Sequence, residues 1–189
     1  MRDARLLFDA AMFQAMVREL ARRGAGRRES GAFLLTDRDH PADCLPQPVT
    51  AIAYYDDLDP DCLTGAITFG ADGYTALAAL CRRGALRVVG DIHTHPFNRV
   101  AQSRIDAANP MIALDGHVAL IAPRFAVGVT DAEMLGVHVR EGGGWSSSFG
   151  AQSAALVRIR DRGRPGLRRV LLLLAHHLIS RWKRIGRNT

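Results

Sequence analysis

The sequence contains little cysteine, little glutamate, few aromatic residues and almost no lysine. Its three cysteines, Cys44, Cys62 and Cys81, are odd in number and form no Cys-Xaa-Xaa-Cys pair. This spacing argues against a disulfide framework and against a thiolate zinc site, so we expect reduced thiols. No apolar run reaches the roughly 18 residues of a spanning helix, and the N-terminal stretch lacks the apolar region of a signal peptide. We therefore expect a cytoplasmic protein.

Charge is distributed unevenly along the chain. Residues 158–189 hold ten basic residues against the single Asp161, a charge of +9, whereas residues 1–157 hold 15 basic and 18 acidic residues, a charge of −3. A basic tail suits nucleic acid, an anionic membrane surface or an acidic protein. Nothing in the body favours nucleic acid, because its arginines are not interleaved with aromatic residues on strands. Lys183 is the only lysine among the 25 basic residues; a G+C-rich genome or selection against modifiable lysines would each explain this.

One stretch concentrates residues that bind metals. The apolar run 86–90 predicts a buried strand, so His93 and His95, two residues apart at its end, should point to the same face. Ser103, followed three residues later by Asp106, indicates the first turn of a helix that can direct a carboxylate back at the histidines. Alone, each pattern also fits an ordinary strand rim or helix cap. Together they predict a site of two imidazoles and one carboxylate, which suits zinc with a fourth position open for water, as in a catalytic site.

A hydrolytic zinc site also needs a general base, and the chain has only four glutamates. Glu29 opens the apolar stretch 29–35, where a carboxylate at the edge of a core strand needs a specific reason. Catalysis is one such reason, and a salt bridge to Arg27 or Arg28 is the other.

These residues resemble a known motif. A strand-borne Glu is followed by Gly and a Leu pair, and some sixty residues later come His-Xaa-His-Pro, six residues and Ser-Xaa-Xaa-Asp. The pattern is similar to the JAMM motif of the JAB/MPN metalloprotease family and covers roughly residues 25–140. The resemblance implies that Glu29 is the base, that Ser103 helps to hold the oxyanion, and that the zinc ligands are His93, His95 and Asp106. Thr94 and Thr36 depart from the commoner form at positions without a catalytic role.

The run after the motif is similar to bacterial members encoded beside ubiquitin-like proteins and their conjugating enzymes. The resemblance therefore implies a zinc isopeptidase or peptidase that cleaves after the C-terminal Gly of a ubiquitin-like protein. Its partners would be that protein or its conjugates, and conjugation enzymes of the same operon. Two alternatives remain: a non-catalytic MPN scaffold, and a DNA-associated JAB-fold protein that only the basic tail favours.

The 189 residues, 48% of them hydrophobic, fit one domain that buries its own core. We expect an α/β fold, a curved mixed sheet flanked by helices with the zinc site at a strand end, over residues 1–150, and a basic extension over residues 151–189. The hydrophobic spacing predicts a helix over 9–23, with Leu6 and Leu7 on its apolar stripe, and a helix over 72–83 capped by Asp72. Other strands are expected at 29–36, 49–55, 64–69, 117–122 and 134–140, and a flexible turn at 142–144.

Three further features need a role. The segment Asp56, Asp57, Asp59 and Asp61 predicts an exposed loop, which serves either solubility or, more weakly, guidance of a basic, glycine-ended substrate tail. His117 and His138 lie away from the ligand spacing, so we interpret them as packing or hydrogen-bonded histidines. Residues 162–166 predict a linker, and 167–185 an amphipathic helix that packs on the domain, docks an acidic partner or lies on an anionic membrane.

Overall fold

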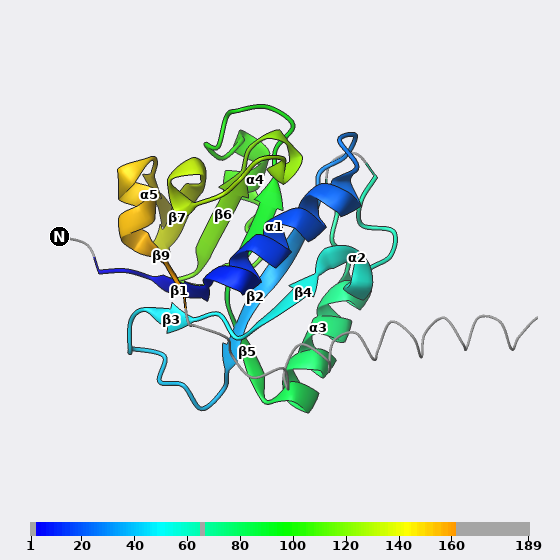
Figure 1. Ribbon diagram of the computed structural model, residues 1–189. Coiled ribbons are helices and arrows are strands. Elements are labelled where there is room, and N and C mark those ends of the chain that lie inside the picture. Colours follow the sequence, from blue (N-terminus) through cyan, green and yellow to red (C-terminus); the bar gives the residue numbers. More distant parts are fainter. Residues whose placement is uncertain (1–2, 65–66, 162–189) are drawn as a thin grey trace, which may run out of the picture.

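The computed structural model describes residues 3–64 and 67–161, and its main feature is a six-stranded mixed sheet (Figure 1). The strand order is β4-β2-β5-β6-β7-β8; β5 and β6 run parallel and the other neighbouring pairs run antiparallel. The predicted α/β class, with a mixed sheet flanked by helices, is confirmed. The strands are β2 Gly31–Asp37, β4 Ala51–Tyr54, β5 Leu86–Thr94, β6 Val118–Ala122, β7 Gly136–Glu141 and β8 Gly144–Ser148.

Both faces of this sheet are covered by a helix and a hydrophobic core. Side chains alternate along β2, so Ala32 and Leu34 join the core with α1 (Ala10–Gly24), and Phe33 and Leu35 join the core with α3 (Ala71–Gly84). Because both faces are buried, β2 has a continuous apolar run in place of an alternating pattern.

A small parallel sheet joins the two ends of the described chain. Its strands are β3 (Gln47–Pro48), β1 (Leu6–Asp9) and β9 (Val157–Arg160), and α5 (Ala151–Leu156) leads into β9 (Figure 1). Residues 151–160, which we placed in the extension, therefore belong to the same folded body, and Leu156 and Val157 lie in its core.

The predicted helix over 9–23 is present as α1, but the assignment of Leu6 and Leu7 to its apolar stripe was wrong. Leu6 and Leu7 form strand β1, in which Leu6 and Phe8 are fully buried on one side. The helix begins only after Asp9, whose carboxylate accepts a hydrogen bond from the Met12 backbone and so caps the first turn.

Other predicted elements are wrong or were missed where contacts between residues distant in the sequence determine the local structure. The predicted strand over 64–69 is not seen in the described part of that segment, where Ile67 forms an isolated bridge with Leu63 and Phe69 packs edge-on against Phe33. Helix α3 is capped by Gly70, so Asp72 lies inside its first turn. Gly142 and Gly143 form a turn, as expected for 142–144, but Gly144 begins the polar strand β8, which was missed together with α5 and β9.

The remaining short elements are α2 (Tyr55–Leu58), α4 (Arg104–Ala108), and the 3-10 turns η1 (Arg124–Ala126) and η2 (Ala132–Met134). The predicted linker over 162–166 and helix over 167–185 lie outside the described residues. Within the described part of the chain, no helix has the length and apolarity needed to cross a membrane. The three cysteines are free thiols, as expected.

Candidate metal centre

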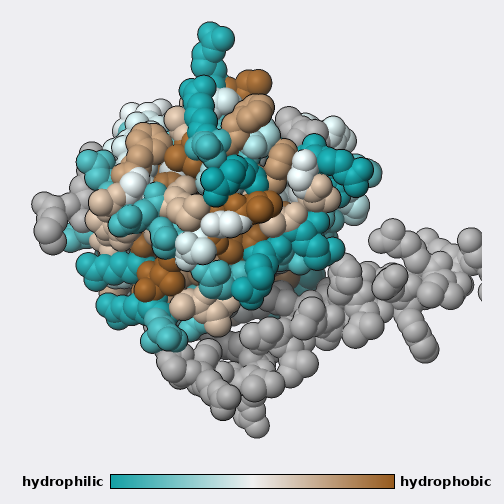
Figure 2. Space-filling model, turned by 45° about the horizontal axis from the view of Figure 1, so that its top comes forward, coloured by the Kyte–Doolittle hydropathy of each residue, from teal (hydrophilic) through white to brown (hydrophobic). Residues whose placement is uncertain are grey.

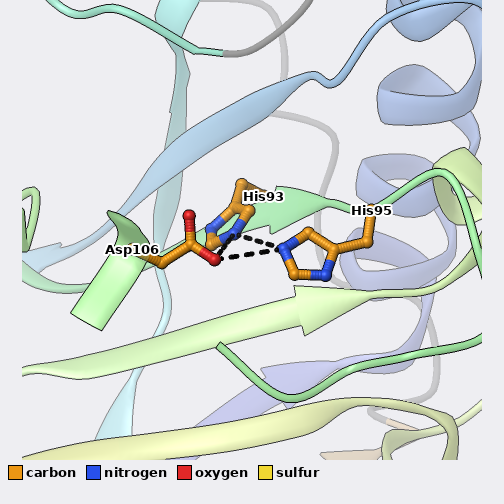
Figure 3. Close-up of side chains that lie close together, drawn as sticks. All are labelled: His93, His95 and Asp106. Carbon is orange, nitrogen blue, oxygen red and sulfur yellow. Dashed lines mark hydrogen bonds and ion pairs between the residues drawn. The ribbon is translucent and has the colours of Figure 1, made fainter. Parts of the chain in front are cut away.

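The three predicted ligands converge at the end of β5. His93 lies in the strand and His95 follows its last residue, and their Nε2 atoms are 3.2 Å apart (Figure 3). The Oδ2 atom of Asp106, on α4, lies 3.3 Å from Nε2 of His95 and 3.9 Å from Nε2 of His93. Among the described residues, these three form the group that could hold a metal ion.

The spacing of these donor atoms suits a tetrahedral ion. Ligands of tetrahedral zinc lie about 3.3 Å apart, because zinc bonds to nitrogen and oxygen are about 2.0–2.1 Å long. Two of the three separations match this value closely, and the third is slightly longer. Two imidazoles and one carboxylate leave a fourth position for water or substrate.

Asp106 is oriented by the start of its own helix. Ser103 is the N-cap of α4: its Oγ accepts from the Asp106 backbone, and Asp106 Oδ2 accepts from the Ser103 backbone at 2.7 Å. This capping box and the metal-site geometry use the same carboxylate oxygen. The helix-cap and metal-site interpretations of this pair are therefore compatible.

The connection from His95 to α4 is fixed by backbone carbonyls. Nδ1 of His95 lies 3.0 Å from the Arg99 carbonyl oxygen, and Nε2 of His138 lies 3.0 Å from the Val100 carbonyl oxygen. Gly136 allows this close approach, because a methyl group there would collide with the same Val100 oxygen. His138 is thus a hydrogen-bonded histidine, as we expected. Trp145, which we did not predict as part of the site, donates to the Ala107 carbonyl and holds α4 against β8.

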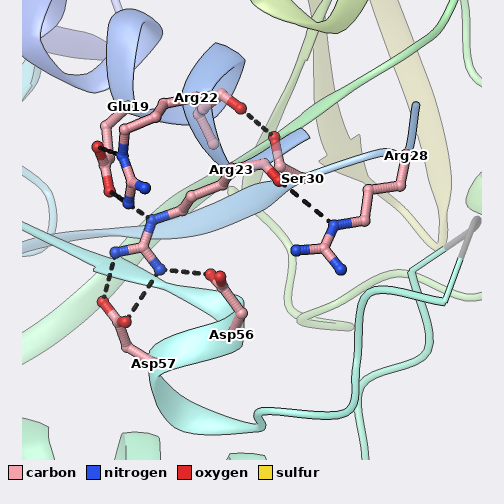
Figure 4. A network of polar contacts seen from close by, with 8 residues as sticks. Glu19, Arg22, Arg23, Arg28, Ser30, Asp56 and Asp57 are labelled. Atoms are coloured by element: carbon pink, nitrogen blue, oxygen red, sulfur yellow. Dashed lines mark hydrogen bonds and ion pairs between the residues drawn. The ribbon is translucent and has the colours of Figure 1, made fainter. Parts of the chain in front are cut away.

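Glu29 is placed beside the ligands by its neighbour Ser30. The Ser30 backbone donates to Oγ1 of Thr94 at the end of β5, and the Ser30 hydroxyl donates to the Leu20 carbonyl in α1. Arg28 donates to the carbonyls of Arg23 and Leu63 (Figure 4 shows the first contact), and no arginine of the described residues pairs with Glu29. The salt-bridge explanation for Glu29 therefore finds no support there.

Glu29, Ser103 and the three ligands line one cleft of about 390 Å³. Its rim includes Phe97 and Ile105, which are 75% and 74% exposed. On the face that Figure 2 views, hydrophobic patches interrupt the hydrophilic surface.

The surroundings shift the pKa values of these groups in different directions. Burial raises the pKa of Glu29, and the nearby His93 and His95 offset only part of that effect. Burial also opposes ionisation of Asp106, but its hydrogen bond with His95 and the charge of His93 outweigh this, so its pKa lies well below the usual range. For His95, burial lowers the pKa, but bonds to Asp106 and to the Arg99 carbonyl leave it raised. A carboxyl with a raised pKa beside ionised ligands suits a proton carrier.

Asp91 is a buried residue of the site that the sequence reasoning missed. Its Oδ1 lies 2.6 Å from Nε2 of His117, its Oδ2 accepts from the Tyr55 hydroxyl at 3.1 Å, and Oδ2 lies 4.0 Å from Nδ1 of His93. Burial raises its pKa, but the hydrogen bond with His117 and the nearby His93 lower it more, to about 2. The available signal was an Asp inside an apolar run, two residues before a ligand. His117 is a hydrogen-bonded histidine, as expected.

The acidic segment is not the exposed loop that we predicted. Asp56 and Asp57 lie in or beside the first turn of α2 and contact the Arg23 guanidinium, with Asp57 at 2.9 Å (Figure 4). Asp59 accepts from the Gly70 backbone at 2.8 Å, and Asp61 is exposed. Three of the four carboxylates are thus engaged within the protein: Asp56 and Asp57 because α2 lies beside the C-terminal end of α1, and Asp59 at the start of α3.

No protein-family model matches the sequence. Among solved structures, the chain is similar to the solution structure of protein DSY2949 from Desulfitobacterium hafniense, with 16% identity and a TM-score of 0.56 over 83% of this chain and 94% of the other. It is also similar to the solution structure of a protein from Salinibacter ruber, with 17% identity and a TM-score of 0.52 over 86% and 96%. A crystal structure of AF2198, a JAB1/MPN domain protein from Archaeoglobus fulgidus, matches at 12% identity and a TM-score of 0.39 over 83% and 99%, which is too distant to support a conclusion. The first two likenesses show a shared fold and no more.

Proposed function

We propose that the protein is a zinc-dependent hydrolase that cleaves an amide or isopeptide bond after the C-terminal Gly of a ubiquitin-like protein. The observation that supports this most directly is the convergence of two imidazoles, one carboxylate and the separate Glu29 on one cleft. The JAMM-like spacing of the same residues in the sequence supports the choice of bond and substrate. The proposed partners are the ubiquitin-like protein or its conjugates, with conjugation enzymes encoded nearby.

His93, His95 and Asp106 would hold the zinc ion. When bound there, zinc would supply a Lewis acid for the substrate carbonyl and would bring the pKa of a bound water to about 7. Residues of the protein would carry out the proton transfers and stabilise the oxyanion. Glu29 takes a proton from the attacking water and returns it to the leaving amine, for which its raised pKa suits it.

Ser103 is suited to stabilise the tetrahedral oxyanion. Its Oγ already accepts the Asp106 backbone N–H, so the hydroxyl proton is free to be donated into the cleft. The exposed side chains Phe97 and Ile105 on the rim give an extended substrate segment apolar surface to pack against. Asp61 remains the candidate for guiding a basic tail, because the other three acidic residues of that segment are engaged within the protein. The basic residues beyond 161 are proposed to contact an acidic partner or an anionic membrane.

The test is Glu29→Gln in the full-length, zinc-loaded protein. The substitution keeps the size of the side chain and removes the basic carboxylate, so cleavage of a ubiquitin-like protein fused to a reporter should fall by about 10²- to 10⁴-fold. Zinc content and substrate binding should stay near wild type. A Glu29→Gln protein that cleaves at the wild-type rate would exclude the mechanism. A wild type that binds zinc but cleaves no such fusion would favour the non-catalytic scaffold.

A further inference from the structure

We propose that Asp91 is a positioning residue that holds the imidazole of His93 from behind, so that its Nε2 atom faces His95 and Asp106. This inference rests on the proposed function, because it assumes that a metal ion binds to these ligands. Asp91 and His93 are two residues apart in β5 and therefore point to the same face of the sheet. Nε2 of His93 faces the other ligands, and Nδ1 faces Asp91 Oδ2 at 4.0 Å.

The carboxylate itself is held in place by two buried donors. His117 is 6% exposed and contacts Oδ1, and the fully buried Tyr55 donates its hydroxyl to Oδ2. An ionised carboxylate can only accept hydrogen bonds, so each neighbouring group must present a proton to it. Nδ1 of His93 lies 4.0 Å from Oδ2, beyond direct hydrogen-bonding distance, but the nearby negative charge favours a proton on Nδ1, which leaves the lone pair of Nε2 for a metal.

Tyr55 can occupy its position because the residue opposite His93 in the sheet is a glycine. Gly31 of β2 pairs with His93 in the sheet register, and a methyl group on Gly31 would collide with the Tyr55 ring and approach the Ile92 carbonyl oxygen at 2.8 Å. Gly31, two residues after Glu29, therefore leaves the space in which Tyr55 reaches Asp91. This contact joins α2, β2 and β5 behind the site.

The two histidines are supported differently. His95 faces a neutral backbone carbonyl, that of Arg99, whereas His93 faces a charged carboxylate that is only 2% exposed. Burying a carboxylate within an apolar sheet is costly unless its charge is compensated. A charged acceptor behind a ligating imidazole fixes the ring and raises its basicity, which offers a functional reason for this costly group.

The test compares the metal affinity of full-length wild type with that of Asp91→Asn, using zinc and cobalt(II) in competition with a chromophoric chelator. Asp91→Asn keeps the side-chain shape but replaces a charged acceptor, and we expect about 10- to 100-fold weaker binding and an altered cobalt(II) visible spectrum. Ser153→Ala is the matched control. Ser153 is equally buried and donates to the Leu135 carbonyl away from the site, so its loss should lower thermal stability without changing affinity or spectrum.

Nitrogen-15 NMR of the zinc-loaded wild type gives a second measurement that does not depend on how Asp91→Asn folds. His93 should be protonated on Nδ1 and bound to zinc through Nε2. An unprotonated Nδ1, or an Asp91→Asn protein with wild-type affinity and spectrum, would overturn the inference while leaving the proposed function intact. A wild type that binds neither metal would overturn both.

Discussion

The cluster around Arg23 and the cluster around the two ligand histidines are both built from ionisable side chains. They differ in whether a cation of the protein compensates their carboxylates. The guanidinium of Arg23 contacts the carboxylates of Glu19, Asp56 and Asp57 and lies 4.2 Å over the ring of Tyr54 (Figure 4). Its donors are therefore matched by acceptors within the protein. The histidine cluster, defined as His93, His95, Asp106 and Glu29, gathers nitrogen and oxygen lone pairs, and no arginine of the described residues pairs with its carboxylates.

This difference separates a structural network from a binding site. A satisfied ion network rigidifies the elements that it joins, here α1 and α2, and removing its central cation leaves unpaired carboxylates. A cluster of lone pairs costs stability and is expected where a protein binds a cation or moves protons. The two clusters should therefore respond to mutation in opposite ways, one in stability and the other in metal binding.

The largest effect is expected for Asp106→Asn. The amide oxygen can still accept from the Ser103 backbone and keep the helix cap, but the charged ligand is lost. Zinc affinity should fall by more than the roughly 100-fold seen when outer groups are removed, with little loss of thermal stability. Titration with a zinc indicator measures this, and Asp43→Asn, an exposed acid, is the control. If Asp106→Asn bound zinc like the wild type, the assignment of this ligand would be wrong.

Arg23→Met should show the opposite behaviour. The Arg23 side chain is 9% exposed, so removing it leaves carboxylates facing each other, and we expect a loss of about 3 kcal/mol in the free energy of unfolding. Zinc affinity of the folded protein should fall far less than in Asp106→Asn. Denaturant unfolding gives the first quantity, and chelator competition gives the second. An equal loss of affinity in both variants would show that the two clusters are not separable.

Acid should weaken the Arg23 cluster through Glu19. Hydrogen bonds from Arg22 and Arg23 lower the pKa of this carboxyl against the opposing effect of burial. Its contribution to stability is therefore present above the unfolded pKa of about 4.3 and lost as pH falls through the lower folded value. The difference in unfolding free energy between wild type and Arg23→Met should shrink over that range. A difference that grows on acidification would contradict the ion pairing.

The smallest effect is expected for Arg22→Met, which serves as the matched control one residue away. Arg22 pairs with Glu19 on the same helix, but its side chain is 68% exposed, so solvent screens the pair. Its loss should change the unfolding free energy by less than about 0.5 kcal/mol. A loss as large as that of Arg23→Met would mean that burial does not decide the strength of these contacts.

The part of this site that could be predicted from the sequence is the part built by local geometry. His93 and His95 share a face because strands have a period of two, and Asp106 points back because Ser103 begins a helix. Asp91 and Tyr55 could not be paired in advance, because the fold brings them together from separate elements, β5 and α2.

The same limit applies to the fold. β6 is apolar throughout, β2 contains the apolar run Ala32–Leu35, and both were predicted, whereas the polar β8 is recognisable only beside β7. The stretch Leu6–Asp9 fits a helical stripe until its strand partner is known, and that partner lies some 150 residues later in the chain.

The pairing of β1 with β9 has a consequence for how the chain folds during synthesis. Leu6 and Phe8 leave the ribosome early, but the strand that covers their edge, Val157–Arg160, is made only after every other described element. Until then, β1 has an open edge and two large apolar side chains in an incomplete core, a condition that favours chaperone binding or aggregation. Nascent chains whose residues up to 156 have cleared the ribosome should therefore be sensitive to protease near β1, and chains whose residues up to 160 have cleared it should be protected.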